Sequence, residues 1–378
     1  MDFDLTPEQR GLCEQIEQFA HNRLGEGVDG DGFSRERWRL CAEQGLLGLH
    51  VPAPLGGAGY DPLTVVLVLE SIGYACSDNG LLFSINAHLW GCATPILGFG
   101  SEEQKQQFLP RLCGGELLGA GAATEPGAGS DVFALATSAE RRNGGGWVLN
   151  GSKAFVTNGP AADLFVVLAS CDPAAGAAGL ATFVVERGTP GLKLGPPQAT
   201  MGLGTAVVGT LELDECELRD GALLGEPGDG MAIFALSMQW ERTCILACAV
   251  GTMRRQLERS TAYARERRQF AHPLMSFQAV SHRLAEMKVR LETARLLLYR
   301  GAWLLAQRRA TALDASLTKL YLSESFVASS LDALAVHGGN GYLREWDLER
   351  DVRDALGSRV YGGTSEMQRN IIAGLLTT

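Results

Sequence analysis

The chain has 378 residues and a formal net charge of −10, and its sequence pI is near 5.2. Hydrophobic residues make up 46% and charged residues 20%, which is an ordinary globular composition in a chain long enough for two or three domains. The acidic balance argues against nucleic acid as the main partner, because a phosphate backbone requires a basic face.

No secretory or membrane-spanning segment is expected. Residues 1–4 contain two aspartates and no basic residue, and the longest apolar stretch, 64–69, is far shorter than the roughly 20 residues that span a bilayer. The nine cysteines are odd in number, scattered and without a C-x-x-C pair, so reduced thiols are expected rather than disulfides or metal ligands. These features predict a cytoplasmic protein with no metal and no membrane partner.

Residues 1–118 are predicted to form an N-terminal helical domain. Thr6 and Gln9 bracket a proline and a glutamate, which is the pattern of a capped helix start. Further helical stretches are expected at 62–75 and from Ser101 onward, on the basis of their apolar spacing and start signals.

Residues 119–225 differ in composition, because they are rich in glycine and in short runs of β-branched and aromatic residues. Asn150-Gly151 is a hairpin-turn pair between two of these runs. No strand alternates with a helix, so a dinucleotide-binding βαβ fold is disfavoured. A middle β-barrel domain is therefore predicted for this stretch.

Residues 226–378 are predicted to be helical again. Apolar residues recur every three or four positions, which indicates helices over 229–265, 275–308, 312–337 and 348–374. Four long amphipathic segments with short breaks predict a C-terminal four-helix bundle. The fold class expected overall is mainly α with a middle β domain.

Three short segments contain candidate binding residues, but each also has a purely local explanation. The loop 124–131 (TEPGAGSD) can bring backbone N–H groups close to an anion such as a pyrophosphate, or it can simply be a turn that enters the β domain. Residues 155–159 (FVTNG) fit a strand end, and residues 337–341 (HGGNG) fit a helix C-cap.

Taken together and in order, these segments resemble the acyl-CoA dehydrogenase family over essentially the whole chain. The resemblance is carried by the segments 124–131, 155–159, 267–270 (RRQF) with Gln278, 336–341 and 361–366 (YGGTSE). It implies an N-terminal helical domain, a middle β-barrel and a C-terminal four-helix bundle, usually in a homotetramer. It also implies FAD as the cofactor.

The resemblance implies two groups of FAD-binding residues. One group would bind the flavin and its pyrophosphate within the same chain, with Phe155 in the place of a family tryptophan and Thr157 near flavin N5. The other would reach the FAD of a neighbouring subunit. The positions implied are Thr124, Ser130, Phe155, Thr157, Thr364 and Glu366, and, for the neighbouring subunit, Arg267, Phe270, Gln278, Gly338 and Gly339. Ala335 stands where the family often has glutamine, which removes one polar contact.

The same resemblance implies α,β-desaturation of an acyl thioester, in which a base removes the α-proton and flavin N5 takes the β-hydride. Many members carry the basic glutamate at the position of Gly362. A subset carries it on a bundle helix just before an arginine, as Glu241 and Arg242 stand here. Glu241 is therefore the predicted base, Gly362 offers a backbone N–H to the thioester carbonyl, and Arg242 would line the thioester entrance.

The sequence does not distinguish whether the acyl group is carried on CoA or on a carrier protein. Segments such as 237–242 and 290–299 look most like the branch that acts on prolyl and other groups tethered to carrier proteins, whereas 201–206 resembles general acyl-CoA dehydrogenases. The partners implied are an acyl thioester on CoA or on a phosphopantetheinyl carrier protein, and an electron-transfer flavoprotein or similar acceptor. The alternatives are a flavin oxidase or monooxygenase on the same fold, and a non-catalytic FAD-binding scaffold.

Overall fold

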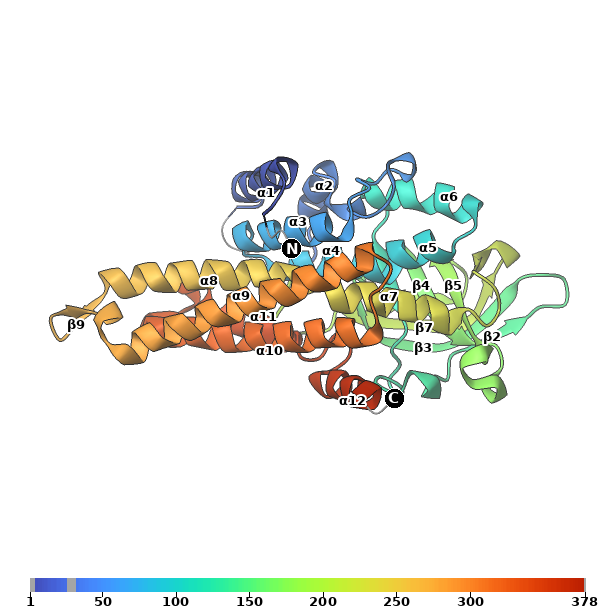
Figure 1. Ribbon diagram of the computed structural model, residues 1–378. Coiled ribbons are helices and arrows are strands. Elements are labelled where there is room, and N and C mark those ends of the chain that lie inside the picture. Colours follow the sequence, from blue (N-terminus) through green and yellow to red (C-terminus); the bar gives the residue numbers. More distant parts are fainter. Residues whose placement is uncertain (1–3, 26–31, 377–378) are drawn as a thin grey trace.

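The computed structural model describes residues 4–25 and 32–376. Figure 1 shows a group of N-terminal helices along the top, a β-sheet on the right, and long helices that extend to the left. The N-terminal helices are α1 (Pro7–Phe19), α2 (Arg35–Glu43), α3 (Pro62–Ala75), α4 (Asn79–His88), α5 (Thr94–Phe99) and α6 (Glu102–Cys113).

Local sequence signals account for where these helices begin. The predicted cap at Thr6 is confirmed, because its hydroxyl accepts the N–H of Gln9 while the Gln9 side chain accepts the N–H of Thr6. Ser101 and Gln104 form the same reciprocal pair at the start of α6. Each pair satisfies backbone donors that the first turn of a helix leaves free.

The middle of the chain forms one eight-stranded sheet, which is the predicted β domain. Its strand order is β6-β7-β3-β2-β4-β5-β8, with β1 paired in parallel to β4. The strands are β1 (Gly119–Ala122), β2 (Ser138–Arg141), β3 (Trp147–Thr157), β4 (Leu164–Ser170), β5 (Leu180–Glu186), β6 (Leu192–Leu194), β7 (Val208–Leu218) and β8 (Leu223–Leu224). The hairpin turn predicted at Asn150-Gly151 is wrong, because both residues lie inside β3, where the β3–β7 pairing shifts register between Leu149 and Gly151. The pairing shifts again between Lys153 and Val156, so β3 has a second irregularity where Phe155 lies.

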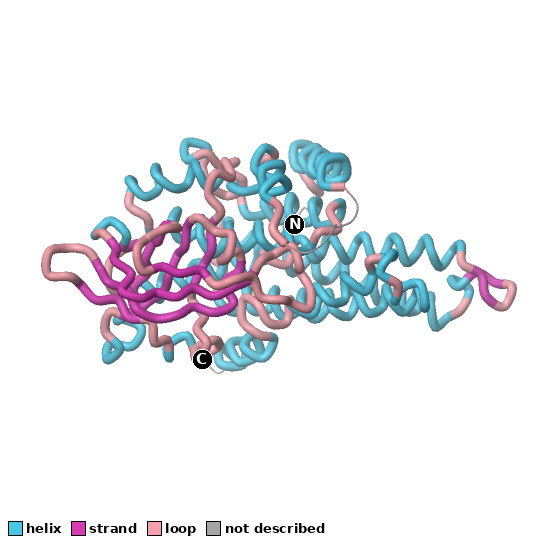
Figure 2. The backbone as a smooth tube through the Cα atoms, turned by 180° about the vertical axis from the view of Figure 1, so that it is seen from behind, coloured by secondary structure: helices cyan, strands magenta, loops and turns pink. Residues whose placement is uncertain are grey.

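The C-terminal part is helical, but two of its predicted helices are each divided. The stretch expected as 229–265 forms α7 (Gly230–Cys244) and α8 (Ala247–Glu266), and the one expected as 348–374 forms α11 (Leu348–Gly357) and α12 (Ser365–Leu376). The long helices α9 (Gln278–Ala306) and α10 (Ala312–His337) agree with the prediction to within three residues. The hairpin of β9 (Arg268–Gln269) and β10 (His272–Pro273) joins α8 to α9 at the end of the bundle opposite the sheet (Figure 2).

Two adjacent glycines account for the break between α11 and α12. Gly362 and Gly363 have φ angles of 65° and 88°, in the left-handed region that other residues rarely adopt. The amphipathic pattern continues through these positions, but the backbone turns there. This turn, residues 358–364, meets α7 next to Glu241.

A close crossing of α3 and α8 joins the N-terminal helices to the bundle. A Cβ on Gly73 would lie 2.1 Å from the carbonyl oxygen of Cys248, and a Cβ on Gly251 would lie 2.0 Å from that of Glu70. Neither position has room for a side chain, so the two backbones can approach at these points.

Two helical stretches, 79–99 and 230–266, have the length and apolar composition of a membrane span. Their most apolar windows are 78% and 56% buried inside the protein. Trp90, Cys244 and Val250 are fully enclosed examples from these stretches. Core packing within the molecule therefore accounts for much of their apolar character.

Candidate active site

Glu241 lies in the last turn of α7, against the turn that joins α11 to α12. A Cβ placed on Gly362 would lie 3.0 Å from Oε1 of Glu241. Glycine at position 362 thus leaves the carboxylate from α7 uncrowded at this place. The structure therefore brings together two of the predicted site residues that are 121 positions apart in the sequence.

The environment of Glu241 places its protonation step near neutral pH. Burial raises the pKa of the Glu241 carboxyl to about 7, and the positive charges of Arg242 and Lys319 act in the opposite direction. Burial has the larger effect, because a carboxylate removed from water loses its hydration. A carboxyl group poised in this way can exchange a proton with a weak carbon acid near pH 7.

The turn beside Glu241 is held by side chains that bind its carbonyl oxygens. Arg242 Nε donates to the Gly362 oxygen at 3.0 Å. The Gln368 amide donates to the oxygens of Gly362 and Gly363 at 3.2 and 3.0 Å. These three hydrogen bonds fix the peptide orientation of the turn, so the carbonyls point toward Arg242 and Gln368.

A second group of predicted residues meets where β1 leads into the loop 124–131. The backbone N–H of Ala154 donates to the carbonyl oxygen of Thr124 at 2.9 Å, so this loop lies directly beside β3. Phe155, the next residue, has a φ of 54° and a side chain that is 69% exposed. An exposed aromatic ring in a left-handed conformation is unusual, and it marks a surface suited to a flat ligand.

A buried ion pair between Lys153 of β3 and Glu125 holds the loop 124–131 in place. Lys153 Nζ lies 2.7 Å from Oε1 of Glu125, and the two side chains are 0% and 6% exposed. The Glu125 carboxylate also accepts the N–H groups of Ala136 and Thr137, at 2.6 and 3.0 Å. A buried carboxylate with this many donors is well satisfied, so Glu125 links the start of the loop to β3 and to residues 136–137, which lead into β2.

The residues around this loop fit the flavin and pyrophosphate of FAD. A Cβ on Gly127 would meet nothing within 4 Å, and Ser130 is exposed beside it. The open glycine positions leave backbone N–H groups accessible to an anion, and the Phe155 ring offers a face for stacking. FAD bound here would be held by Thr124, Ser130, Phe155 and Thr157.

The residues predicted to reach a neighbouring subunit's FAD lie elsewhere in the chain. Arg267 and Phe270 belong to the β9–β10 hairpin at the far end of the bundle, where Phe270 is 88% exposed (Figures 1 and 2). Gln278 begins α9, and Gly338 and Gly339 follow α10 with no atom within 4 Å of a Cβ at either position. One chain alone does not bring these residues to its own sheet.

Thr364 and Glu366 lie at the start of α12. The Thr364 hydroxyl accepts the N–H of Met367 at 3.2 Å, which caps the helix, and Glu366 pairs with Arg369 at 3.4 Å. Thr364 is the last residue of the turn that contacts Glu241, and Glu366 follows it in the first turn of α12. The structure therefore links the predicted base and the last predicted cofactor segment through one short stretch of chain.

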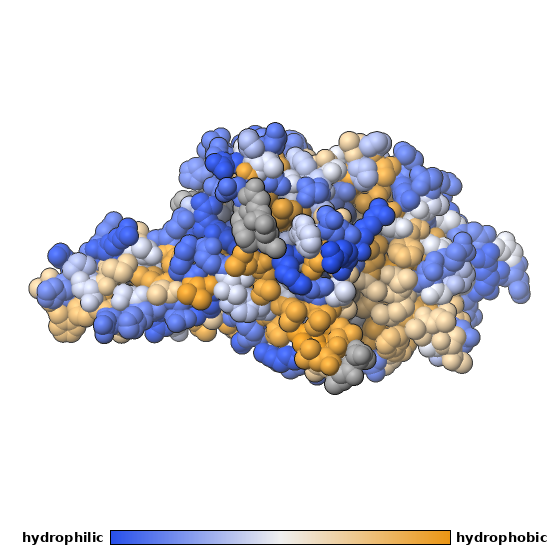
Figure 3. Space-filling model, viewed as in Figure 1, coloured by the Kyte–Doolittle hydropathy of each residue, from blue (hydrophilic) through white to orange (hydrophobic). Residues whose placement is uncertain are grey.

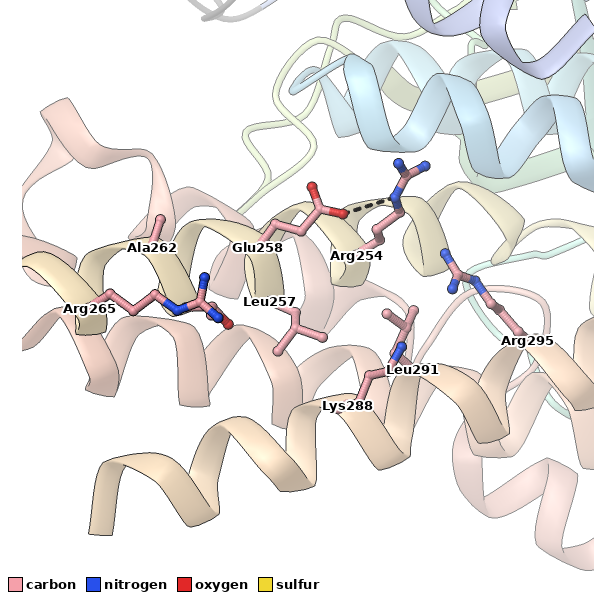
Figure 4. Close-up of a pocket in the computed structure, with 9 residues that line it drawn as sticks. Arg254, Leu257, Glu258, Ala262, Arg265, Lys288, Leu291 and Arg295 are labelled. Atoms are coloured by element: carbon pink, nitrogen blue, oxygen red, sulfur yellow. Dashed lines mark hydrogen bonds and ion pairs between the residues drawn. The ribbon is translucent and has the colours of Figure 1, made fainter. Parts of the chain in front are cut away.

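A groove of about 410 Å³ between α8 and α9 lies apart from all of these residues (Figure 4). Its lining includes Arg254, Arg265, Lys288 and Arg295, and Figure 4 shows the Arg254–Glu258 ion pair at its edge. None of the predicted site residues contributes to it. Among the described residues, no group of three or more His, Cys, Asp or Glu side chains is placed to hold a metal ion.

Three residues that shape the site do not belong to any of the motifs in the sequence. Lys319 of α10 is fully buried near Glu241, Gln368 holds the 362–363 turn, and Lys153 pairs with Glu125. Lys319 is the only Lys or Arg between 312 and 337, which was the one available signal. Burial of such residues depends on packing between distant segments, and no local pattern reports it.

Comparison with known proteins now decides the family. Models of the acyl-CoA dehydrogenase N-terminal, middle and C-terminal domains match residues 6–116, 120–216 and 228–376. The chain belongs to the acyl-CoA dehydrogenase family. It is 40% identical over 375 residues to an L-prolyl-[peptidyl-carrier protein] dehydrogenase of Pseudomonas fluorescens, covering 99% of both chains.

Solved structures agree with this assignment. The crystal structure of the prolyl acyl carrier protein oxidase AnaB superposes with a TM-score of 0.96 and 46% identity, covering 99% of this chain and 100% of AnaB. The FAD complex of PigA superposes with a TM-score of 0.95 and 36% identity, covering 100% and 99%. The protein is thus an FAD-dependent oxidoreductase that acts on the CH–CH bond of a thioester carried on CoA or on a carrier protein.

The Glu125–Lys153 pair generates a prediction about cofactor retention. Lys153→Met leaves a buried carboxylate without its counter-charge, a change that typically costs about 3–5 kcal/mol. The loop 124–131 should loosen, so the purified variant should retain less FAD per chain and melt at a lower temperature. Flavin absorbance after gel filtration measures the FAD content, and a thermal scan measures the melting temperature.

The matched control is Lys193→Met, which removes an exposed lysine paired with Asp214 on the same sheet and should leave both quantities unchanged. Full FAD occupancy in Lys153→Met would contradict this role.

Proposed function

We propose that Glu241 is the base that removes the α-proton of the substrate thioester. The observation that carries this proposal is the burial of its carboxylate against Gly362, with a pKa raised to about 7. The α-hydrogen of a thioester is weakly acidic, so its removal needs both a desolvated base and a donor to the carbonyl oxygen. Glu241 meets the first of these requirements.

The turn beside Glu241 supplies a candidate for the second requirement. Arg242 and Gln368 bind the carbonyl oxygens of the turn, while the Gly362 N–H has no protein acceptor in the described part of the chain. We assign this N–H to the thioester carbonyl. FAD, when bound, supplies the acceptor for the β-hydrogen and its electron pair. Arg242 holds the turn in position beside Glu241 through its hydrogen bond to the Gly362 oxygen.

The substrate we propose is an L-prolyl group on a peptidyl carrier protein. The support is the full-length similarity to the Pseudomonas fluorescens L-prolyl-[peptidyl-carrier protein] dehydrogenase and to AnaB, at 40% and 46% identity. A CoA thioester is the second candidate, because both tethers end in the same kind of arm. The electron acceptor we propose is an electron-transfer flavoprotein. AnaB, named an oxidase, makes oxygen the alternative.

An anaerobic flavin titration tests the substrate. We expect L-prolyl-carrier protein to bleach the flavin band of the purified holoenzyme within one turnover, because the β-hydrogen leaves with two electrons. Acyl-CoAs of short, branched and long chain are the comparison set. Bleaching by an acyl-CoA and not by prolyl-carrier protein would contradict the proposed substrate. Admitting air after reduction then distinguishes the acceptors, since rapid reoxidation would indicate an oxidase.

We also propose a homotetramer, because the predicted cofactor residues lie in two places that one chain keeps apart. Apolar surface supports assembly: Val289, Leu296 and Trp303 are seven residues apart on α9 and are 59%, 54% and 47% exposed. Figure 3 shows apolar side chains gathered on the surface over α12 as well. Residues spaced by seven share one helix face.

Light scattering tests the assembly. The wild-type holoenzyme should have about four times the mass of one chain, and Leu296→Glu should give smaller species, because a charge would be buried between helices. FAD content should fall with the assembly if the hairpin reaches a neighbouring chain. A wild-type monomer that retains FAD would contradict the proposal.

A further inference from the structure

Lys319 is a buried lysine in the N-terminal third of α10. Its side chain is 0% exposed, and its Nζ has no hydrogen-bond partner in the described part of the chain. An ammonium group in this state is costly, because it has lost its hydration without a direct replacement. The other fully buried lysine, Lys153, has Glu125 as a direct partner. Lys319 therefore needs a separate explanation.

The location of Lys319 points to Glu241. A Cβ at Gly362 would lie 3.0 Å from Oε1 of Glu241 and 3.9 Å from Cε of Lys319. The end of the lysine and the carboxylate thus converge on the same side of the 362–363 turn, one from α10 and the other from α7. We propose that Lys319 is a positioning residue whose buried positive charge keeps Glu241 in the carboxylate form that can accept the α-proton.

The charges around the pair are consistent with this role. The ionisable groups that act on Lys319 are Arg242 and Glu241 from α7, Glu324 from α10 and Glu366 from α12. The Tyr361 phenol also lies near Glu241, and burial raises its pKa, so it stays neutral. Cys248 of α8 and Asp354 of α11 act on Tyr361 rather than directly on Glu241.

Arg242 exerts the larger effect on Glu241, but its guanidinium is already engaged with the turn. Its Nε donates to the Gly362 oxygen, so replacing it would change the geometry as well as the charge. Lys319 makes no such bond. It is the residue at which charge can be removed with the least change to the turn. The inference rests on the proposed role of Glu241, and it extends that role to the residue that sets the charge.

The sign of the effect follows from the two titrations. Burial, and then Arg242, lowers the pKa of Lys319 to about 8, so its ammonium form is present at pH 7 and is lost above pH 8. With the pKa of Glu241 at about 7, activity in the wild type should fall as the pH drops below 7. Removing the lysine charge should raise the pKa of Glu241, because only burial and Arg242 would then act on it.

The test compares Lys319→Met with Lys319→Arg in the FAD-loaded enzyme. Infrared difference spectra against Glu241→Gln follow the protonated carboxyl band of Glu241 with pH, and they need no substrate. We expect Lys319→Met to raise the pKa of Glu241 by about one unit or more, a tenfold loss of carboxylate at acid pH. Lys319→Arg and the surface control Lys193→Met should keep it near the wild-type value.

The pH profile of kcat/KM is the second readout. Its acid limb should move to higher pH in Lys319→Met, with about a tenfold loss at pH 6 and recovery toward wild-type activity at pH 9. An equal loss at every pH, with the infrared pKa unchanged, would overturn the inference and leave Lys319 a structural residue. If instead Glu241→Gln were fully active, the proposed base would fail while the infrared result for Lys319 still stood. If Lys319→Met does not fold, Lys319→Gln takes its place in both measurements.

Discussion

The site depends on one constraint, which is that a carboxylate must be kept out of water and still be able to ionise. Burial alone would hold Glu241 in its protonated form, and a protonated carboxyl is not a base. The glycine at position 362 makes room for the carboxylate, and the cations Arg242 and Lys319 oppose the cost of its burial. The helices α7 and α10 and the α11–α12 turn are each needed to place one of these groups.

The same turn shows how backbone geometry and electrostatics are joined. Gly362 has a left-handed φ, its carbonyl is bound by Arg242 and Gln368, and its Cα faces Glu241. A Cβ at this position would lie 3.0 Å from Oε1 of Glu241, so a side chain here would crowd the carboxylate and would also strain the left-handed backbone. Glycine at 362 therefore suits a glutamate at 241.

Much of the fold could be predicted from the sequence, because capping residues and helical spacing are local signals. Asn150-Gly151 was wrongly predicted as a turn, since a short Asn-Gly pair can also lie at a register shift inside one long strand. The order of five short segments also predicted the family, and the family was confirmed by comparison. The breaks after Cys244 and Gly357 were not predicted, since the apolar pattern runs through both. Glu241 was a candidate only because Gly362 replaced the usual glutamate. Lys319 could not be found because a lysine on a long helix is usually solvated, and its burial comes from the packing of α10 against other helices, α7 and α12 among them.

The identity of the base is the central claim, and single-turnover flavin reduction tests it most directly. The FAD-loaded wild type and Glu241→Gln would be mixed with substrate without oxygen, with Glu226→Gln as a control for loss of an exposed carboxylate. We predict that Glu241→Gln retains FAD but reduces it about a hundredfold more slowly or worse, the usual loss when a general base is removed. A rate within a few-fold of wild type would contradict the assignment of Glu241.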